Sequence, residues 1–494
     1  MPRFAAIALP CLRIELAGGE GPRGIVLARP GGTVKRETDL LGATRLDAVS
    51  MEARDLGVRA GDTIAAARAK AHTIRVRVVA EASITETLGR LAELGLAFGA
   101  TTSFDLHHDL VWVDVTGCAH LYGGERPLAE RLTARVTELG HACRVAIADG
   151  PRIAAAVARH ASIVRRGPFV VGAGKSAAAM RVLPVAALPL EEATMAWLRD
   201  LGMETIGDLQ TFPARALAVR LGDRAAEVMA LLRGDDAAPL TPYRPPPLLE
   251  ERGELEYGVE STDALLFVAK SLCDRMAARL EGRAMGASKV ELELELDRAM
   301  LGEGARQREA LAVGLASPLV KATDLFAVLR AKIDSFVVSA PVLAMTLRVP
   351  EVARIDPRAL ELFERVTMTD RTLSRLAAEL SAELGSANVG VLEAVDTWVP
   401  EERARLVPYG KAPAVATTPR IDETPEPMRF LSIPQKLASA PPDLTPVARL
   451  EAVEWWREAS PCNRETAIGW VDGALAWIEI DQESGETWLR GWID

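Results

Sequence analysis

An alternation of helical and strand patterns between residues 84 and 165 places the strongest limit on the fold. A leucine-rich helical stripe over 84–99 precedes a strand pattern over 109–116, which has valine at every second position. A helical segment, a strand at 144–148 and a further helical segment follow. This order predicts an α/β domain that ends near residue 165. The apolar segment 3–16 is expected to add a first, buried strand.

The rest of the chain predicts an α+β multidomain protein, because 494 residues exceed what one hydrophobic core holds. Two proline-rich stretches indicate linkers. Six of the nine tryptophans lie within residues 455–492 and indicate a small β-rich module. The expected segments are 1–165, 166–237, a linker at 238–249, 250–347, a connecting region at 348–407, a second linker at 408–428, and 429–494.

Charge and cysteine content narrow the class of protein. The net charge of −10 is unfavourable for a DNA-binding protein, and residues 250–347 hold 12 Lys and Arg against 16 Asp and Glu. Any affinity for DNA should therefore be modest and sensitive to salt. The five cysteines show no CxxC spacing, which is typical of reduced cytoplasmic thiols. No apolar run approaches the length of a membrane span, so a cytoplasmic protein is expected.

Residues 198–212 match the pattern of a helix-hairpin-helix turn. Gly202 allows the first helix to end, and Thr205 is placed to cap the second. Backbone N–H groups at the start of the second helix, at Ile206 and Gly207, would suit a DNA phosphate. The alternative is a plain corner between two helices.

Several segments, taken in order, resemble Y-family DNA polymerases. Residues 50–63 (SMEARDLGVRAGDT) resemble the fingers motif, 109–117 (DLVWVDVTG) the palm strand, and 153–162 (IAAAVARHAS) a further conserved helix of that family. The helix-hairpin-helix resembles the thumb, and residues 250–347 resemble the little finger. The segment GCAHLYGGE and the long Trp-rich tail are most similar to the ImuB-type branch of the family.

The resemblance implies that the polymerase chemistry is lost. Such enzymes hold two Mg²⁺ ions with carboxylates from the first strand and the palm strand. Ala8 stands where the first-strand Asp is expected, and Leu110 where the palm-strand Glu is expected; Asp109 alone remains. We therefore predict no intact catalytic residue, no metal pair and no other cofactor. Rescue by another acid would need a shifted strand; the candidates are Glu15, Asp105, Asp114 and Asp149.

Two arginines are candidate nucleotide-phosphate contacts by the same resemblance. Arg54 matches the family's phosphate-binding Arg in the fingers motif, and Arg159 stands in place of a phosphate-binding Lys. The alternative for each is an ordinary solvated helix face.

Residues 358–363 resemble the short peptide with which these polymerases bind the sliding clamp. Leu360, Leu362 and Phe363 could fill the clamp's apolar pocket, although the usual Gln is missing. An amphipathic helix edge would explain the same pattern.

Three other motifs point elsewhere. Residues 167–176 (GPFVVGAGKS) approach a phosphate-binding loop but have Phe169 where a Gly is required. The LYGGE segment is similar to a hairpin of nucleotide cyclases but lacks the acidic residues that follow it, which favours a simple glycine turn. The spacing of His107, His108 and His120 is unsuited to a shared metal.

The resemblance as a whole predicts a non-catalytic, nucleoid-associated DNA-binding adaptor in error-prone translesion synthesis and SOS mutagenesis. Its implied partners are DNA, the sliding clamp, an ImuA-type protein and an error-prone C-family DNA polymerase. Two alternatives stay open. One is an active translesion polymerase that uses displaced carboxylates, and the other is a nucleotide-binding or cyclase-like signalling enzyme on a palm fold.

Overall fold

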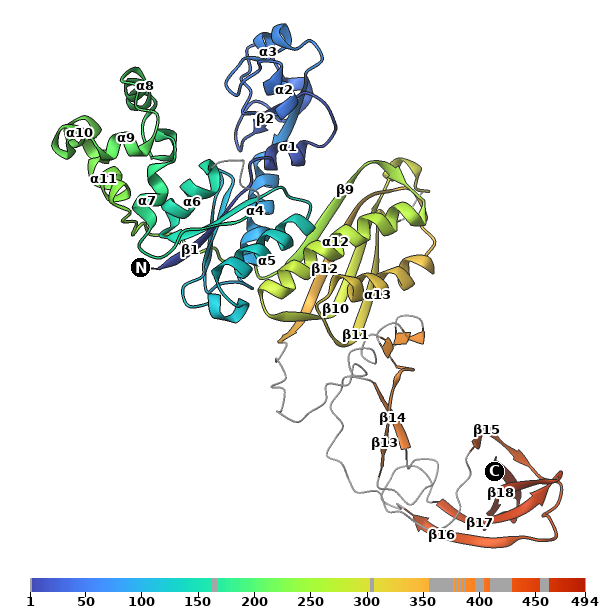
Figure 1. Cartoon of the computed structure of the whole chain (residues 1–494). Coiled ribbons are helices and arrows are strands. Elements are labelled where there is room, and N and C mark those ends of the chain that lie inside the picture. The colour runs from blue at the N-terminus through green and yellow to red at the C-terminus, as the bar shows by residue number, and fades with distance from the viewer. Residues whose placement is uncertain are drawn as a thin grey trace. The chain divides into compact units, whose positions relative to one another are not determined.

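The structure is a computed structural model with a mixed α/β architecture (Figure 1). It divides into two compact units, Met1–Val313 with Pro318–Phe363, and Gly314–Ser317 with Glu364–Asp494. The described residues are 2–161, 167–302, 306–354, 376–377, 380–381, 384–385, 387–395, 404–408, 429–453 and 462–493.

A five-stranded sheet organises the first part of the larger unit, with β1 in its centre. β1 pairs antiparallel with β6 and β7, and β8 joins β7 in parallel. Helices α4 and α5 pack on one face, and α6 packs on the other. In sheet order the strands are β5 (Thr102–Asp105), β6 (Leu110–Asp114), β1 (Arg3–Ala8), β7 (Arg144–Asp149) and β8 (Phe169–Val170); the helices are α4 (Glu81–Gly95), α5 (Glu125–Glu138) and α6 (Pro151–His160).

The expected strand over 3–16 is wrong in its second half. β1 ends at Ala8, and helix α1 (Leu12–Ala17) follows after a tight turn. Pro10 lies in that turn, where it has no N–H to donate to a neighbouring strand. The amide of Glu15 donates instead to the carbonyl oxygen of Cys11, which begins the helix.

Residues 22–80 form a small lobe with a core of its own, centred on Val26, Leu46 and Ile64. The hydroxyls of Ser50 and Thr63 cap its two helices by accepting backbone hydrogen bonds. Strands β2 and β4 pair in parallel. The elements are β2 (Arg23–Ala28), β3 (Ala48–Val49), β4 (Arg75–Ala80), α2 (Met51–Asp55), α3 (Ile64–Lys70) and the 3-10 turn Glu37–Asp39.

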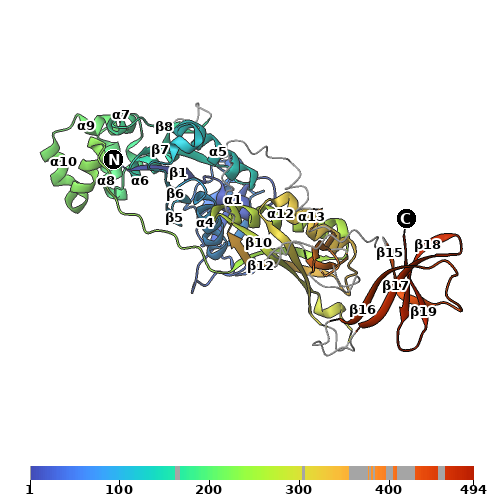
Figure 2. The ribbon, with the colours of Figure 1, turned by 90° about the horizontal axis from the view of Figure 1, so that it is seen from below.

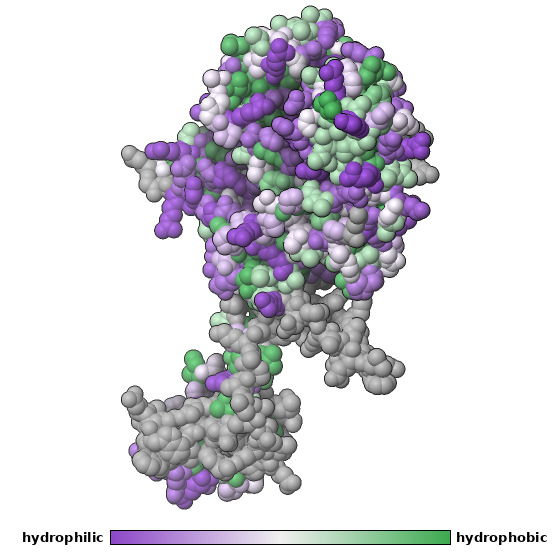
Figure 3. All heavy atoms as spheres, turned by 90° about the vertical axis from the view of Figure 1, so that its left-hand side faces the viewer, coloured by the Kyte–Doolittle hydropathy of each residue, from purple (hydrophilic) through white to green (hydrophobic). Residues whose placement is uncertain are grey.

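A group of short helices, residues 176–233, packs on the α6 face of the sheet through one apolar cluster. Gly202 follows α8 with φ +71°, a left-handed conformation that suits glycine. The helices are α7 (Ser176–Arg181), α8 (Glu192–Asp200), α9 (Ile206–Gln210), α10 (Ala214–Leu221) and α11 (Ala225–Arg233), with 3-10 turns at Val185–Ala187 and Gly222–Arg224. On the face shown in Figure 3, hydrophilic and apolar residues are intermingled.

The last part of the larger unit is a four-stranded sheet with two helices, α12 and α13, on one face (Figures 1 and 2). Along β10 the apolar residues from Val290 to Leu296 are buried, and the alternate charged residues from Lys289 to Glu295 lie on the open face. The elements in sheet order are β11 (Arg308–Leu319), β10 (Met285–Leu296), β12 (Val342–Arg354) and β9 (Leu249–Val259), with α12 (Thr262–Gly282) and α13 (Ala322–Asp334).

A buried ionic network joins α12 to α4. Glu93 and Glu251 are fully buried, and Arg279 bonds to both, at 2.6 Å through Nε to Glu93 and at 3.0 Å through Nη1 to Glu251. Arg90 reaches Glu251 at 2.8 Å. Because both carboxylates are removed from water, they depend on these guanidinium groups for compensation.

The segment 238–249, expected as a linker, has no helix or strand before β9. It is nevertheless attached to the first sheet. The amide of Tyr243 donates to the carbonyl oxygen of Thr102 at 2.7 Å, and the Tyr243 ring packs against Phe104.

The smaller unit contains a hairpin and an antiparallel five-stranded sheet. The sheet's core is made by Ala476, Ile478 and Leu489; Trp477 is buried, whereas Trp470 is exposed. The hairpin pairs β13 (Gly390–Ala394) with β14 (Ala404–Pro408); the sheet order is β15 (Arg429–Lys436), β19 (Thr487–Trp492), β18 (Ala474–Asp481), β17 (Cys462–Val471) and β16 (Thr445–Val453). Within the described ranges of the chain, no helix is both long and apolar enough to cross a membrane.

Candidate active-site cleft

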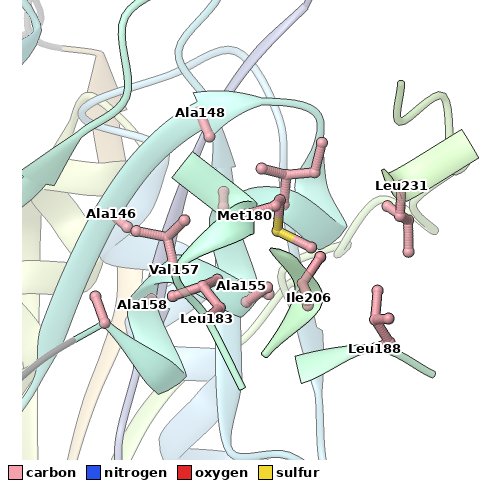
Figure 4. Packing of buried hydrophobic residues seen from close by; sticks show 14 of the residues in the cluster. Ala146, Ala148, Ala155, Val157, Ala158, Met180, Leu183, Leu188, Ile206 and Leu231 are labelled. Carbon is pink, nitrogen blue, oxygen red and sulfur yellow. The ribbon is translucent and has the colours of Figure 1, made fainter. Parts of the chain in front are cut away.

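The two positions expected to have lost carboxylates are neighbours in the first sheet. Ala8 ends β1 and lies opposite Leu110, the first residue of β6. Their side chains are 4% and 2% exposed and belong to the apolar cluster on the α6 face, part of which is shown in Figure 4. Neither residue offers an oxygen ligand to a hard cation such as Mg²⁺. The ends of these two strands are therefore part of the hydrophobic core.

Asp109 lies in the turn between β5 and β6, not on the strand where sequence analysis placed it, and its φ is +52°. Its carboxylate forms an ion pair with Arg13 of α1, with Nε 2.9 Å from Oδ2. The Nη2 group of Arg13 also donates to the carbonyl oxygen of His107 at 3.1 Å. Burial raises the pKa of Asp109, and the guanidinium opposes that shift. The one matching carboxylate thus already has a cationic partner.

Asp105 ends β5 and holds the same turn. It contacts His108 (Oδ2 to Nδ1, 2.7 Å) and accepts a hydrogen bond from the amide of His107 at 2.8 Å. The hydrogen bond to His108 is the main cause that lowers the pKa of Asp105 to about 2. His108 is thus paired with a carboxylate, and among the described residues no cluster of three or more His, Cys, Asp or Glu side chains could hold a metal ion.

The other acids considered as substitutes have protein partners as well. Glu15 contacts His141 (Oε2 to Nδ1, 2.9 Å) and accepts from the amide of Ala142. Asp114, at the end of β6, accepts from the amide of Thr116 at 3.0 Å. Neither lies at the ends of β1 and β6 where Ala8 and Leu110 meet.

The segment that approaches a phosphate-binding loop has a structural role, because it binds the carboxylate of Asp149. This carboxylate, 2% exposed, accepts from Arg3 Nη1 at 2.8 Å, from the amide of Gly174 at 2.7 Å and from the hydroxyl of Ser176 at 3.3 Å. A protein carboxylate thus occupies the position in which such a loop would hold a phosphate. Lys175 is exposed.

The LYGGE segment forms a glycine turn that opens a helix, as expected. Its first two residues end a 3-10 turn, Ala119–Tyr122, and Gly124 precedes α5 with φ +127°. The Tyr122 hydroxyl donates to the carbonyl oxygen of Ala97 at 2.6 Å, which anchors the turn to the end of α4.

A cavity of about 430 Å³ opens beside Leu110 and Trp112. Its apolar wall includes Met180 and Leu188 from the short helices, and Arg159 of α6 lies on its lining. The Arg159 side chain is exposed and forms no ion pair or hydrogen bond within the described part of the chain. Burial lowers the pKa of Arg159, against the opposing effect of Asp105 and Asp109.

Arg54 belongs to the small lobe and is not among the residues that line this cavity. It lies on α2, is exposed, and is close enough to Cys11 to oppose the rise in the pKa of that thiol, which burial causes. Cys11 follows β1 by three residues, and Asp109, close to Arg159, precedes β6. Of the two predicted phosphate contacts, Arg159 therefore lies beside Leu110 on the cavity lining, whereas Arg54 does not line it.

The helix-hairpin-helix turn is present, but the amides of Thr205 and Ile206 have protein acceptors. Thr205 caps α9, and the amide of Ile206 donates to the carbonyl oxygen of Leu183 at 2.8 Å. Ile206 and Gly207 are buried, and Gly207 packs on the Arg181 carbonyl; Gly202 is exposed. Of the four proposed phosphate contacts, Gly202 and Thr205 are therefore the accessible ones.

The predicted clamp-binding residues Leu360, Leu362 and Phe363 lie outside the described residues. Their role stays a prediction from the sequence.

Arg13 and Arg3 are the functional residues that sequence reasoning missed. Arg13 neutralises Asp109 from 96 positions away, and Arg3 joins Asp149 to Glu125 of α5 through contacts of 2.8 and 2.6 Å. The available signal was a charged residue inside an apolar N-terminal segment, which requires a buried partner.

Comparison with known proteins agrees with the resemblance seen in the motifs. Residues 32–159 match the model of the impB/mucB/samB family. Protein ImuB of Caulobacter vibrioides (strain NA1000 / CB15N) is 29% identical over 377 residues, which cover 71% of this chain and 78% of that protein. DNA polymerase IV 2 of Mesorhizobium japonicum is 30% identical over 250 residues, which cover 48% of this chain and 57% of that protein.

Among solved structures, the insertion ternary complex of Dbh DNA polymerase is matched. It is 13% identical, with a TM-score of 0.39, over 72% of this chain and all of that one. The sequence relationships carry the assignment: this chain is a homologue of Protein ImuB, with an impB/mucB/samB family segment at residues 32–159.

Proposed function

We propose that this chain is a catalytically inactive relative of Y-family DNA polymerases that acts as a DNA-binding adaptor in error-prone translesion synthesis. One observation carries the proposal: Ala8 and Leu110 lie side by side in a hydrophobic cluster, and the adjacent Asp109 is paired with Arg13. A two-metal mechanism needs several carboxylate oxygens at one point. Among the described residues at that point, the carboxylate of Asp109 is paired with Arg13 and that of Asp105 with His108.

In this proposal the domains keep the polymerase plan without its chemistry. The first sheet would be the palm, residues 22–80 the fingers, and the helices of 176–233 the thumb. The α12–α13 domain would be the little finger. The cavity beside Leu110 and Arg159 would lie where a primer end is expected. The carboxylate on its lining, Asp105, is paired with His108.

The adaptor role follows from similarity to ImuB and from the sequence motifs. We propose that the chain joins an ImuA-type protein, an error-prone C-family DNA polymerase and the sliding clamp on damaged DNA. Leu360, Leu362 and Phe363 would bind the clamp, and the Trp-rich module would contact the protein partners.

Primer extension tests the loss of catalysis. The purified chain should incorporate no nucleotide with Mg²⁺ or Mn²⁺ on a substrate that a DNA polymerase IV extends. Robust incorporation that disappears in Asp109→Ala would contradict the proposal and favour an active polymerase. Product formation from GTP or ATP, without DNA binding, would instead favour a cyclase-like enzyme.

A further inference from the structure

The small lobe differs in charge from the rest of this acidic protein. Residues 22–80 contain 11 Lys and Arg against 6 Asp and Glu, a net charge of +5, whereas the whole chain carries −10. The α12–α13 domain, at −4 over residues 250–347, has the opposite sign. Phosphate contact depends on local positive charge more than on net charge, so the lobe stands out as a candidate nucleic-acid surface.

Most of the basic side chains of the lobe are available to a ligand. Within the part of the chain that the structure describes, three of them form ion pairs, in which Arg29, Lys70 and Arg77 use three of the six acids. The exposed ones that have no ion pair with any described residue are Lys35, Arg36, Arg45, Arg54, Arg59, Arg68 and Arg75.

Three of these arginines gather around the turn between α2 and α3. Arg59 donates through Nη1 to the carbonyl oxygen of Arg54 at 2.6 Å, and Arg45 donates through Nη1 to the carbonyl oxygen of Gly61 at 2.7 Å. Each of these two guanidinium groups is thus held in place by one nitrogen, while its other nitrogens remain free to donate. The nearby acids Glu52 and Asp55, also on α2, form no ion pair with them.

The open face of the four-stranded sheet shows the reverse pattern. Glu291, Glu293 and Glu295 line β10 on that face, and the neighbouring cations are engaged with carboxylates. Arg348 pairs with Glu293 at 2.9 Å, and Arg252 pairs with Glu295 at 2.9 Å. A phosphate backbone would meet neutralised cations and surplus carboxylates on this face.

We infer that the 22–80 lobe is the main DNA-phosphate contact of the protein, through Arg45, Arg54 and Arg59. The open face of the four-stranded β9–β12 sheet does not bind DNA. This inference rests on the proposed DNA-binding function and says which surface performs it. The ligand is the sugar-phosphate backbone, so binding is independent of base sequence and falls as salt is raised.

The test compares how tightly two triple variants of this chain bind a fluorescein-labelled primer-template. Fluorescence anisotropy measures the affinity at salt concentrations between about 50 and about 200 mM. One variant is R45A/R54A/R59A. The matched control, R298A/R306A/R354A, removes the same charge from exposed arginines of the α12–α13 domain that form no ion pair. Circular dichroism melting establishes that both variants fold.

We expect the lobe variant to lose roughly tenfold or more in affinity and to reduce the slope of log K against log salt by about 3. The control variant should keep the wild-type slope to within about 1. Equal binding by the lobe variant and the wild type, or an equal loss in the control, would overturn the inference and leave the proposed function standing. Absence of DNA binding by the wild type would instead remove the DNA-binding part of the proposed function, and this inference with it.

Discussion

Arg279 of α12 and Glu93 of α4 form an ion pair in which the side chains are only 6% and 1% exposed. Replacing Arg279 by Met would leave Glu93 and Glu251 buried without their shared cation. We expect this change to lower the free energy of unfolding by about 3–5 kcal/mol, the usual cost of breaking a buried pair from one side. Urea denaturation measures it. Arg126→Met, which breaks the exposed Arg126–Glu130 pair, serves as the control and should cost under about 1 kcal/mol; equal costs would show that burial of the network has no energetic effect.

Gly282 provides a steric test of the same contact. A Cβ added there would lie 1.9 Å from the carbonyl oxygen of Glu93, so α12 and α4 would have to separate. We expect Gly282→Ala to destabilise the protein by about 1–3 kcal/mol, as overpacking does, and to speed proteolysis within residues 238–249. Gly302, which has open space around it, is the matched site; Gly302→Ala should leave both measurements unchanged.

The Arg13–Asp109 pair should be visible in a double-mutant cycle. Arg13→Met leaves a largely buried carboxylate alone and should cost about 1–3 kcal/mol in unfolding free energy, whereas Arg13→Met with Asp109→Asn should cost less than the two single changes added together. Additive costs would contradict the pairing.

The Arg13–Asp109 pair should also change how the stability of the fold depends on pH, in a direction that can be worked out. Burial holds the folded-state pKa of Asp109 above the ordinary carboxyl value, so its ionisation disfavours the folded state. Without Arg13 this effect is larger. The stability deficit of Arg13→Met should therefore be smallest in acid, below the unfolded pKa, and should grow as pH rises to 7, a trend that denaturation at successive pH values would detect.

For Asp105 we expect stability to depend on pH in the opposite direction. Its folded-state pKa of about 2 lies below the ordinary 3.8, so folding favours the ionised form. The stability that this provides is present above pH 3.8 and is lost as pH falls toward 2. Asp105→Asn should cost about 1–2 kcal/mol at pH 5, after allowance for partial exposure, and less at about pH 3. A cost that does not change with pH would rule out the ionic contribution.

The clamp prediction can be tested without a structure of its segment. Leu362→Ala with Phe363→Ala should abolish retention on immobilised sliding clamp, because apolar side chains anchor such peptides in their pocket. Leu376→Ala with Leu384→Ala changes two exposed leucines in the same region and should leave retention intact. Unchanged binding by the first variant would exclude this peptide as the anchor.

Sequence patterns predicted the elements whose residues match their local propensity, such as α4 and β6. β9 and β11 show no such pattern, because the sequence there lacks β-branched clusters. β11 reads REALAVGLASPL, in which Ala and Leu favour a helix and only pairing with β10 imposes a strand. Pro10 was available as a signal that β1 ends early. The sequence shows that Ala8 and Leu110 offer no metal ligand, but it does not show the partner of Asp109, because only the folded sheet brings residue 13 beside it.

The central place of β1 has a consequence for how the chain is made. β1 is translated before its two neighbours, β6 and β7, which emerge more than a hundred residues later. Contacts so distant in sequence close slowly, so the apolar segment from Phe4 to Leu9 must wait, unpaired, while the small lobe is synthesised and can fold on its own core. We therefore expect the unpaired β1 segment to be a binding site for ribosome-associated chaperones until β7 leaves the exit tunnel.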